Sequence, residues 1–140
     1  MCLVRSNKEC GPKYAIEDKI CYKILYETDS YYKYLSPYLN FAYELNKRVS
    51  SDFSFINHIP YYFSPQQEYL YFKHSKSFVD GVEQGLHSFE CLSAAIAYRD
   101  CLIKGGIVME CIIPKGSWYY EGIKHELVSD NIIIIKEAVI

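Results

Sequence analysis

Gly85-Leu86-His87-Ser88-Phe89-Glu90 opens the stretch that decides the expected fold, because a helical pattern follows it as far as Lys104. Gly105-Gly106 then separates this pattern from the apolar run Ile107–Ile113. Ser88 fits an N-cap, since its side-chain oxygen can accept a hydrogen bond from a free N–H of the first turn. We therefore predict a helix over about residues 89–104 that stops before the glycines.

Two apolar runs after this helix are typical of strands. Ile107–Ile113 is too short to be a second helix directly after two glycines, and Pro114 ends it. Ile132–Ile135 contains four successive β-branched residues. This favours a strand buried on both faces, because a strand with one wet face alternates. A helix between two strands predicts a sheet with the helix packed across it.

The first half of the chain contains one clear strand. Lys19–Glu27 alternates between two sides, with Ile20, Tyr22, Ile24 and Tyr26 on one and Cys21, Lys23 and Leu25 on the other. Residues 1–18 are expected to be an irregular lead-in, and Phe41–Leu45 to be a short strand or a helical turn. Residues 52–72 are rich in aromatics and contain two prolines, so we expect an aromatic loop or insertion with short edge pieces.

These patterns together predict an α+β fold. We expect a single compact domain over residues 1–140, with a mixed or antiparallel sheet packed against one main helix at about 89–104. A chain of 140 residues fits one domain. A domain near this size buries about 68–70% of the surface that its unfolded chain exposes, so it needs no metal or disulfide to be stable.

Charge and hydropathy bear on the partners and the location. The net charge of −2 and the pI of about 6.1 predict no broad attraction to nucleic acid or to an anionic membrane, so nucleic acid is an unexpected partner. No apolar run reaches the ~18–20 residues that span a bilayer, so we expect no membrane association. The first residues lack the apolar core of a signal peptide, which predicts an intracellular protein, in the host cytoplasm if it is viral.

The cysteines do not form a recognisable metal or disulfide pattern. There are six of them, with no CxxC pair, and the four histidines do not bracket them as in a zinc finger. We predict no metal and no cofactor. Most of the cysteines are interpreted as small buried apolar residues or as exposed free thiols.

The unusual feature of the composition is its 15 tyrosines, which with the other rings make 16% of the chain aromatic. Tyrosine combines a large apolar face with a polar tip, which suits interfaces and the walls of ligand sites. The alternative is compositional, because an AT-rich genome also encodes an excess of Tyr, Ile and Lys. The sequence leaves both explanations open.

Several short motifs resemble a group of small uncharacterised proteins encoded by tailed phages, gut bacteria and large DNA viruses. The motifs are CYKIL (21–25), SPY (36–38) with FAYEL (41–45), GLHSF (85–89), IPKGSWYYEG (113–122) and VSDNIIII (128–135). The resemblance covers most of Lys19–Lys136 and implies a compact α+β domain of mobile-element or viral origin. It carries no established activity, so it supplies no catalytic residues. Residues 52–72 match nothing in the group.

Two places in this pattern are candidate ligand sites. His87 and Ser88, at the expected helix start, could bind a nucleotide ribose or phosphate with the free N–H groups there. Alternatively, His87 satisfies a buried backbone group. Lys115 lies in a turn that lacks the GxxxxGK[ST] spacing but could still face an anion. Beside it, Trp118, Tyr119 and Tyr120 could stack on a base, or could form core or subunit contacts.

Two enzymatic readings stay open at this stage. Cys91 follows His87 closely, in a first turn whose dipole would favour a thiolate nucleophile, although a buried structural cysteine is the alternative. The order of strand, His-Ser and later Glu is also similar to the ADP-ribosyltransferase pattern. That resemblance implies His87, Tyr119 or Tyr120, and Glu110 or Glu121 in one cleft.

No catalytic set emerges from these residues. The leading hypothesis is a non-enzymatic accessory binding protein of phage or viral type. It would contact a protein partner or a small nucleotide-like ligand through an aromatic-rich surface. The alternatives are an ADP-ribosyltransferase-like enzyme and a structural virion protein. A homo-oligomer is also expected, because so many aromatic side chains need cover.

Overall fold

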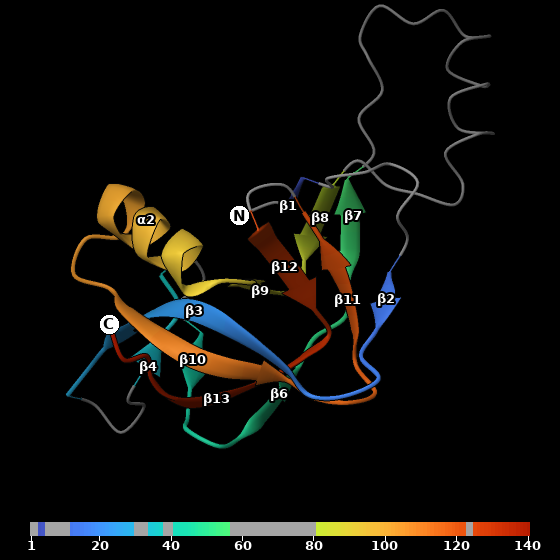
Figure 1. Cartoon of the computed structure of the whole chain (residues 1–140), viewed down its shortest axis with the longest axis horizontal. Coiled ribbons are helices and arrows are strands. Elements are labelled where there is room, and N and C mark those ends of the chain that lie inside the picture. The colour runs from blue at the N-terminus through green and yellow to red at the C-terminus, as the bar shows by residue number, and fades with distance from the viewer. Residues whose placement is uncertain (1–2, 5–11, 30–33, 38–40, 57–80, 123–124) are drawn as a thin grey trace, which may run out of the picture.

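Strands dominate the structure, which is a computed structural model that describes residues 3–4, 12–29, 34–37, 41–56, 81–122 and 125–140 (Figure 1). Within these ranges the only helix is α2 (Leu92–Leu102). The expected α+β fold with a sheet built on one main helix is therefore wrong, and the fold is β-rich and mostly antiparallel. The reason is that short segments which looked irregular in the sequence pair as additional strands.

A large sheet of ten strands carries most of the described chain. Across the sheet the order is β2 (Lys13–Tyr14), β11 (Trp118–Glu121), β12 (Glu126–Ser129), β9 (Leu86–Phe89), β3 (Lys19–Glu27), β10 (Ile107–Ile113), β13 (Asn131–Glu137) and β6 (Arg48–Ser50). Two short strands, β4 (Tyr34–Leu35) and β5 (Ala42–Tyr43), extend it from β3. A second sheet contains β1 (Leu3–Val4), β8 (Gly81–Gln84) and β7 (Ser54–Ile56), and Figure 1 shows it beside β11 and β12.

The strand predicted over Lys19–Glu27 is confirmed as β3, and so is its division into two sides. Cys21 and Leu25 belong to a buried cluster on one side, which we call the inner face. Tyr22, Ile24 and Tyr26 lie on the opposite, outer face, where they pack with α2. Each face of this strand is covered by a different part of the molecule, which explains why both sides are largely apolar.

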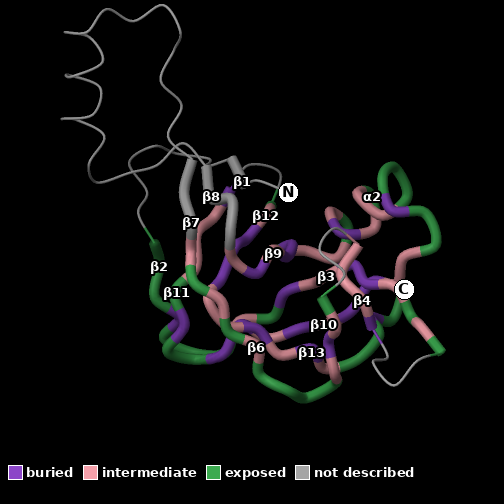
Figure 2. The backbone as a smooth tube through the Cα atoms, turned by 180° about the vertical axis from the view of Figure 1, so that it is seen from behind, coloured by how far each residue is buried: buried purple, intermediate pink, exposed green. Residues whose placement is uncertain are grey.

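The inner face holds the main core. The two halves of the bent sheet meet across it, so that β9 and β12 contribute to the same cluster as β3, β10 and β13 (Figure 2). Its buried members are Ala15, Cys21, Leu25, Tyr34, Tyr43, Leu86, Met109, Cys111, Ile113, Leu127, Ile132 and Ile134. Tyr119 and Val49 pack against it. On the outer face, α2 places Ala95 against a separate cluster that includes Ile24 and Val108.

The predicted start of the helix is wrong. Ser88 lies within β9, which pairs with β12 from Leu86 to Phe89, and the N-cap of α2 is Cys91. Strand pairing supplies partners for the backbone groups that a cap would have served, and it buries Ser88 in the sheet. The helix ends at Leu102, and Gly105 follows it in a turn with φ +83°.

Ile107–Ile113 is confirmed as the strand β10. Phe41–Leu45 contains the short strand β5, and the lead-in over residues 1–18 contains β1 and β2. The aromatic segment 52–72 contains β7, and its residues 57–72 lie outside the described ranges.

The last strand is buried mainly on one face, so the prediction of burial on both faces is wrong. Ile132 and Ile134 are fully buried on the inner face, whereas Ile133 and Ile135 are half-buried. Only part of the outer face of the sheet is covered by α2. The β-branched run therefore fits a strand whose second face is partly open.

Burial on the two sides of β13 predicts unequal effects of truncation. Ile134→Ala should lower the free energy of unfolding by about 3–4 kcal/mol, since it leaves a cavity in the main core. Ile133→Ala should cost about 1–2 kcal/mol, because its side chain is half-buried. Urea unfolding followed by circular dichroism measures both, and equal losses would contradict the assignment of the two faces.

Gly85 joins β8 to β9 with φ +147°, and a Cβ at this position would overlap the side chain of Val128 and lie 3.1 Å from Phe53. Gly85→Ala should therefore destabilise the protein by at least about 2 kcal/mol more than Gly105→Ala. Gly105 is the matched control, because its φ is also positive but no atom lies within 4 Å of the added methyl. Similar unfolding midpoints for the two variants would exclude the close approach of Val128.

Candidate functional site

Five of the six residues predicted to bind a ligand lie on β9 and β11, which both pair with β12, but they do not share one face. Tyr120 of β11 is opposite Val128 of β12, which is opposite His87 of β9. These side chains share the outer face, because Val128 and Tyr120 pack together outside the main core. Trp118 shares this face, since it is two residues before Tyr120 on the same strand.

Ser88 and Tyr119 lie on the inner face instead. Ser88 is 1% exposed, and Tyr119 packs against the main core. Lys115 is exposed in the turn between β10 and β11. These residues were grouped because they are adjacent in the sequence. Successive side chains of a strand point to opposite faces, so the strands separate them. Of the predicted set, Trp118, Tyr120, His87 and Lys115 can take part in an outer-face site.

Four aromatic side chains line the outer face along β11, and we call them the outer aromatic row: Tyr14, Trp118, Tyr120 and Phe53. The rings of Tyr14 and Trp118 meet edge to face, with centroids 5.1 Å apart. The rings of Phe53 and Tyr120 make a second edge-to-face pair at 5.2 Å. The second pair covers Val128, whereas Tyr14 and Trp118 remain 50% and 45% exposed. The exposed end of the row is therefore the pair Tyr14–Trp118.

Backbone hydrogen bonds between two turns fix the position of this exposed pair. Ala15 N donates to Ser117 O at 2.9 Å, and Gly116 N donates to Ala15 O at 2.8 Å. Asp18 Oδ1 accepts from Lys115 N at 2.8 Å. Gly116 adopts φ +91°, which favours glycine in this turn. The residue before Trp118 and the residue after Tyr14 are thus joined directly.

Asp130 holds the backbone of Trp118 on its other side. Its Oδ1 accepts from Trp118 N at 3.0 Å, while its own N–H donates to Trp118 O at 3.1 Å. The same Oδ1 accepts from Asn131 Nδ2 at 2.9 Å. Hydrogen bonds to an ionised acceptor are roughly twice as strong as neutral ones. Asp130 therefore orders the strand that presents Trp118.

A polar cavity of about 450 Å³ adjoins Asp130 and is lined by Ser50, Ser51, Asp52, Asp130 and Asn131. Its side chains largely satisfy one another: Asn131 Oδ1 accepts from Ser50 Oγ at 2.6 Å and from Arg48 Nε at 3.0 Å. None of the predicted ligand residues lines it. The hydrogen bonds around the cavity join β6 to β13, and the cavity does not extend the aromatic surface.

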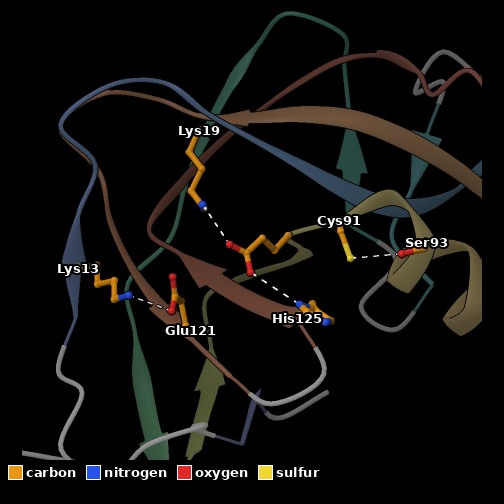
Figure 3. Close-up of polar contacts among 7 residues, drawn as sticks. Lys13, Lys19, Cys91, Ser93, Glu121 and His125 are labelled. Atoms are coloured by element: carbon orange, nitrogen blue, oxygen red, sulfur yellow. Dashed lines mark hydrogen bonds and ion pairs between the residues drawn. The ribbon is translucent and has the colours of Figure 1, made fainter.

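Charged residues gather at the rim between β2, β3 and β9, as Figure 3 shows for Lys13, Lys19, Glu121 and His125. Lys13 Nζ is 2.9 Å from Glu121, and Lys19 Nζ is 3.5 Å from Glu90 and 5.7 Å from the Tyr119 ring. His125 Nδ1 is 3.9 Å from Glu90, on a backbone with φ +60°. Each of these lysines is thus paired with a carboxylate, which weakens the rim as a phosphate site.

The residues of the two enzymatic hypotheses, the Cys91 nucleophile and the transferase-like set, lie in different parts of the structure. His87 and Tyr120 lie on the outer face, whereas Tyr119 and Glu121 lie on the inner side with Lys13. Glu110 of β10 is 4.0 Å from Lys136. The Cys91 sulfur is 3.5 Å from the Ser93 hydroxyl, as Figure 3 shows, and Cys91 serves as the N-cap of α2. These positions do not bring the His, Tyr and Glu of the transferase pattern together, because Glu121 lies on the inner side and Glu110, on the outer face opposite Tyr22, is two strands away from His87.

Two kinds of site are missing from the described part of the chain. No group of three or more His, Cys, Asp or Glu side chains there could hold a metal ion. The helix in those ranges is also too short and too polar to cross a membrane.

The chain matches no family model, no curated protein and no solved structure. Sequence reasoning found Trp118 and Tyr120 but missed Tyr14, Phe53 and Asp130, which complete the same surface. Tyr14 and Phe53 come from distant segments, so no local signal could have joined them to Trp118.

The double hydrogen bond to Trp118 predicts a role for Asp130 in ordering this surface. Asp130→Ala should lower the free energy of unfolding by about 1–3 kcal/mol, because two donors lose a charged acceptor. Asp130→Asn should cost less, since the amide oxygen can still accept from Trp118 N. Urea unfolding followed by Trp118 fluorescence measures both variants. A loss for Asn as large as the loss for Ala would mean that the acceptor oxygen is unimportant.

Proposed function

We propose that this protein is a non-enzymatic accessory binding protein of phage or viral type, which contacts a partner protein through its outer aromatic row. One observation carries the proposal. Tyr14 and Trp118 are half exposed, yet the backbone on either side of them is fixed by hydrogen bonds between two turns and to Asp130. The resemblance of the GLHSF and IPKGSWYYEG motifs to proteins of phages and large DNA viruses supports the origin.

The chemistry of these side chains favours a protein partner. Trp and Tyr are enriched among the residues that dominate protein–protein affinity. A side chain that is already held in place loses little conformational entropy on binding, so more of its contact energy appears as affinity. The edge-to-face contact between the Tyr14 and Trp118 rings, on a backbone that is restrained on both sides, supplies this condition.

A small nucleotide-like ligand is the second candidate. It is favoured by the exposed Lys115, whose turn leads directly into Trp118, since an ammonium beside an aromatic ring suits a phosphate next to a base. A protein partner is preferred because the Tyr14–Trp118 rings meet edge to face on an open strand surface rather than facing each other across a slot.

Catalysis is less well supported than binding. An ADP-ribosyltransferase-like site would need a His, a Tyr and a Glu in one cleft. Glu121 belongs to the face opposite His87, and Glu110 shares the face of His87 but lies two strands away and 4.0 Å from Lys136. A structural virion protein would have to self-associate extensively. The native mass of the protein measures its oligomeric state and so tests this alternative.

The partner can be tested by quantitative affinity capture from host cells with wild-type protein and two variants. Trp118→Ala should reduce recovery of the specific partner at least about tenfold, because loss of a central aromatic anchor commonly costs more than 1.4 kcal/mol. Leu102→Ala is the matched control, since Leu102 is 65% exposed on α2, outside the aromatic row. Direct titration of the purified partner should reproduce the ranking.

Equal recovery with both variants would contradict the proposed surface. Native mass spectrometry of the same preparations distinguishes the small-ligand hypothesis from the structural virion hypothesis. A retained nucleotide-sized mass that disappears in Trp118→Ala would establish the ligand candidate. A large homo-oligomer with no other component would favour a structural role.

A further inference from the structure

Cys21 of β3 and Cys111 of β10 lie directly opposite each other in the centre of the large sheet. Both side chains belong to the inner-face core and are 0% exposed, and both are free thiols. Opposed residues in an antiparallel pair have Cα atoms about 4.5–5.5 Å apart. A disulfide requires about 4.4–6.8 Å, so the pairing register already satisfies its main geometric condition.

The other described cysteines do not share this geometry. Cys91 caps the start of α2, and Cys101 lies near its end. At a rise of 1.5 Å per residue these two are about 15 Å apart, which is far beyond disulfide reach. Among the described cysteines, the cross-strand pair is the one that the backbone places for bonding.

The surroundings of the pair lower the pKa of one thiol and raise the pKa of the other. Interaction with the Cys111 thiol lowers the pKa of Cys21 despite its burial, with help from the positive charges of Lys23 and Lys19. Burial and the neighbouring Cys21 raise the pKa of Cys111 well above its usual value. The two sulfurs therefore act as a coupled pair, which gives up its first proton more readily than its second.

Lys23 connects this pair to the edge of the core. Its side chain is half-buried, and its Nζ donates to His87 O at 2.6 Å and lies 5.4 Å from the Tyr43 ring. Because Lys23 is two residues from Cys21 on the same face, its charge is held close to the sulfur. A cation beside a cysteine favours its thiolate form, but reactive thiols are usually partly exposed and Cys21 is 0% exposed, so an oxidant has to enter the core to reach it.

We propose that Cys21 and Cys111 are a redox modification site, which closes into a reversible cross-strand disulfide when the protein meets hydrogen peroxide. The site is on the inner face of the sheet and is independent of the proposed partner surface. The bond would tie the two central strands together covalently. It would also close the chain segment between the two cysteines, which includes β9 and α2, into a covalent loop.

The reaction balances with peroxide as the oxidant. Cys21 releases its proton, and its thiolate attacks one peroxide oxygen, so that the O–O bond breaks and hydroxide leaves. The sulfur of Cys111 then attacks the sulfur of the Cys21 sulfenic acid. The S–S bond forms, the S–O bond breaks, and the departing hydroxide takes the Cys111 proton to become water. The first hydroxide takes up the released proton, so two thiols are oxidised and one peroxide is reduced to two waters.

The test uses the full chain in a form that keeps only this pair, with Cys2, Cys10, Cys91 and Cys101 each changed to Ser. The native protein is treated with a small excess of hydrogen peroxide, the excess is removed with catalase, and the intact mass is measured under denaturing conditions. The expected result is a loss of about 2 Da, which dithiothreitol reverses. The same protein carrying Cys111→Ser is the matched control and should show no such loss.

Other outcomes overturn the proposal. Oxygen addition of about 32 Da or more per thiol without the 2 Da loss would show that the sulfurs do not pair. Unmodified thiols, or closure only after unfolding and refolding, would show that the native pair is inaccessible. If the four-serine variant does not fold by circular dichroism, wild-type protein is oxidised, alkylated and digested. A linked peptide containing Cys21 and Cys111 is then expected, and its absence excludes the site.

Discussion

The antiparallel pairing of β3 with β10 is the constraint on which the rest of the structure depends. It runs in unbroken register from Lys19 opposite Ile113 to Leu25 opposite Ile107. Because side chains alternate along both strands, this one register decides which residues enter the main core and which face α2. A shift of β3 by one residue would move Cys21 and Leu25 out of the core and bring Tyr22 and Ile24 into it.

Because of this register, both faces of β3 and β10 carry apolar side chains, and each face is covered by another part of the molecule. The inner face is covered by the second half of the same sheet, so Leu86 and Leu127 pack into the cluster that contains Met109 and Ile134. The outer face of β3 and β10 is covered by α2 through Ala95. The helix has only 11 residues and cannot extend over the whole outer face. Beyond it, the aromatic side chains of β11 and its neighbours provide the cover.

Sequence patterns were reliable where local alternation and burial agreed. Lys19–Glu27 and Ile107–Ile113 were predicted with the bounds that the structure gives them, since their apolar runs end at clear breaks. The start of the helix failed because Ser88 satisfies the local rule for an N-cap, while the pairing of β9 with β12 satisfies its backbone instead. Such long-range pairing is invisible to a pattern of neighbouring residues, and it turned an expected α+β fold into a β-rich one.

The candidate site shows the same limit. Trp118 and Tyr120 could be found as a local aromatic cluster, but Tyr119 between them points to the opposite face, which follows only once the segment is known to be a strand. Tyr14 and Phe53 join the surface through pairing of distant segments. Cys21 and Cys111 are likewise neighbours only through β3 and β10, so cysteine spacing in the sequence carried no sign of them.

The two ends of the outer aromatic row differ in a way that composition alone does not explain. A tyrosine excess from an AT-rich genome would scatter rings over the surface without fixing their backbone. Phe53 and Tyr120 behave as core, because they cover the fully buried Val128. Tyr14 and Trp118 cover much less, yet Asp130 and the paired turns hold the backbone around them. Ordering exposed aromatic side chains has an entropic cost without a matching gain from burial in the free protein. Contact with a partner would recover that cost, which is the physical reason to assign binding to this end of the row.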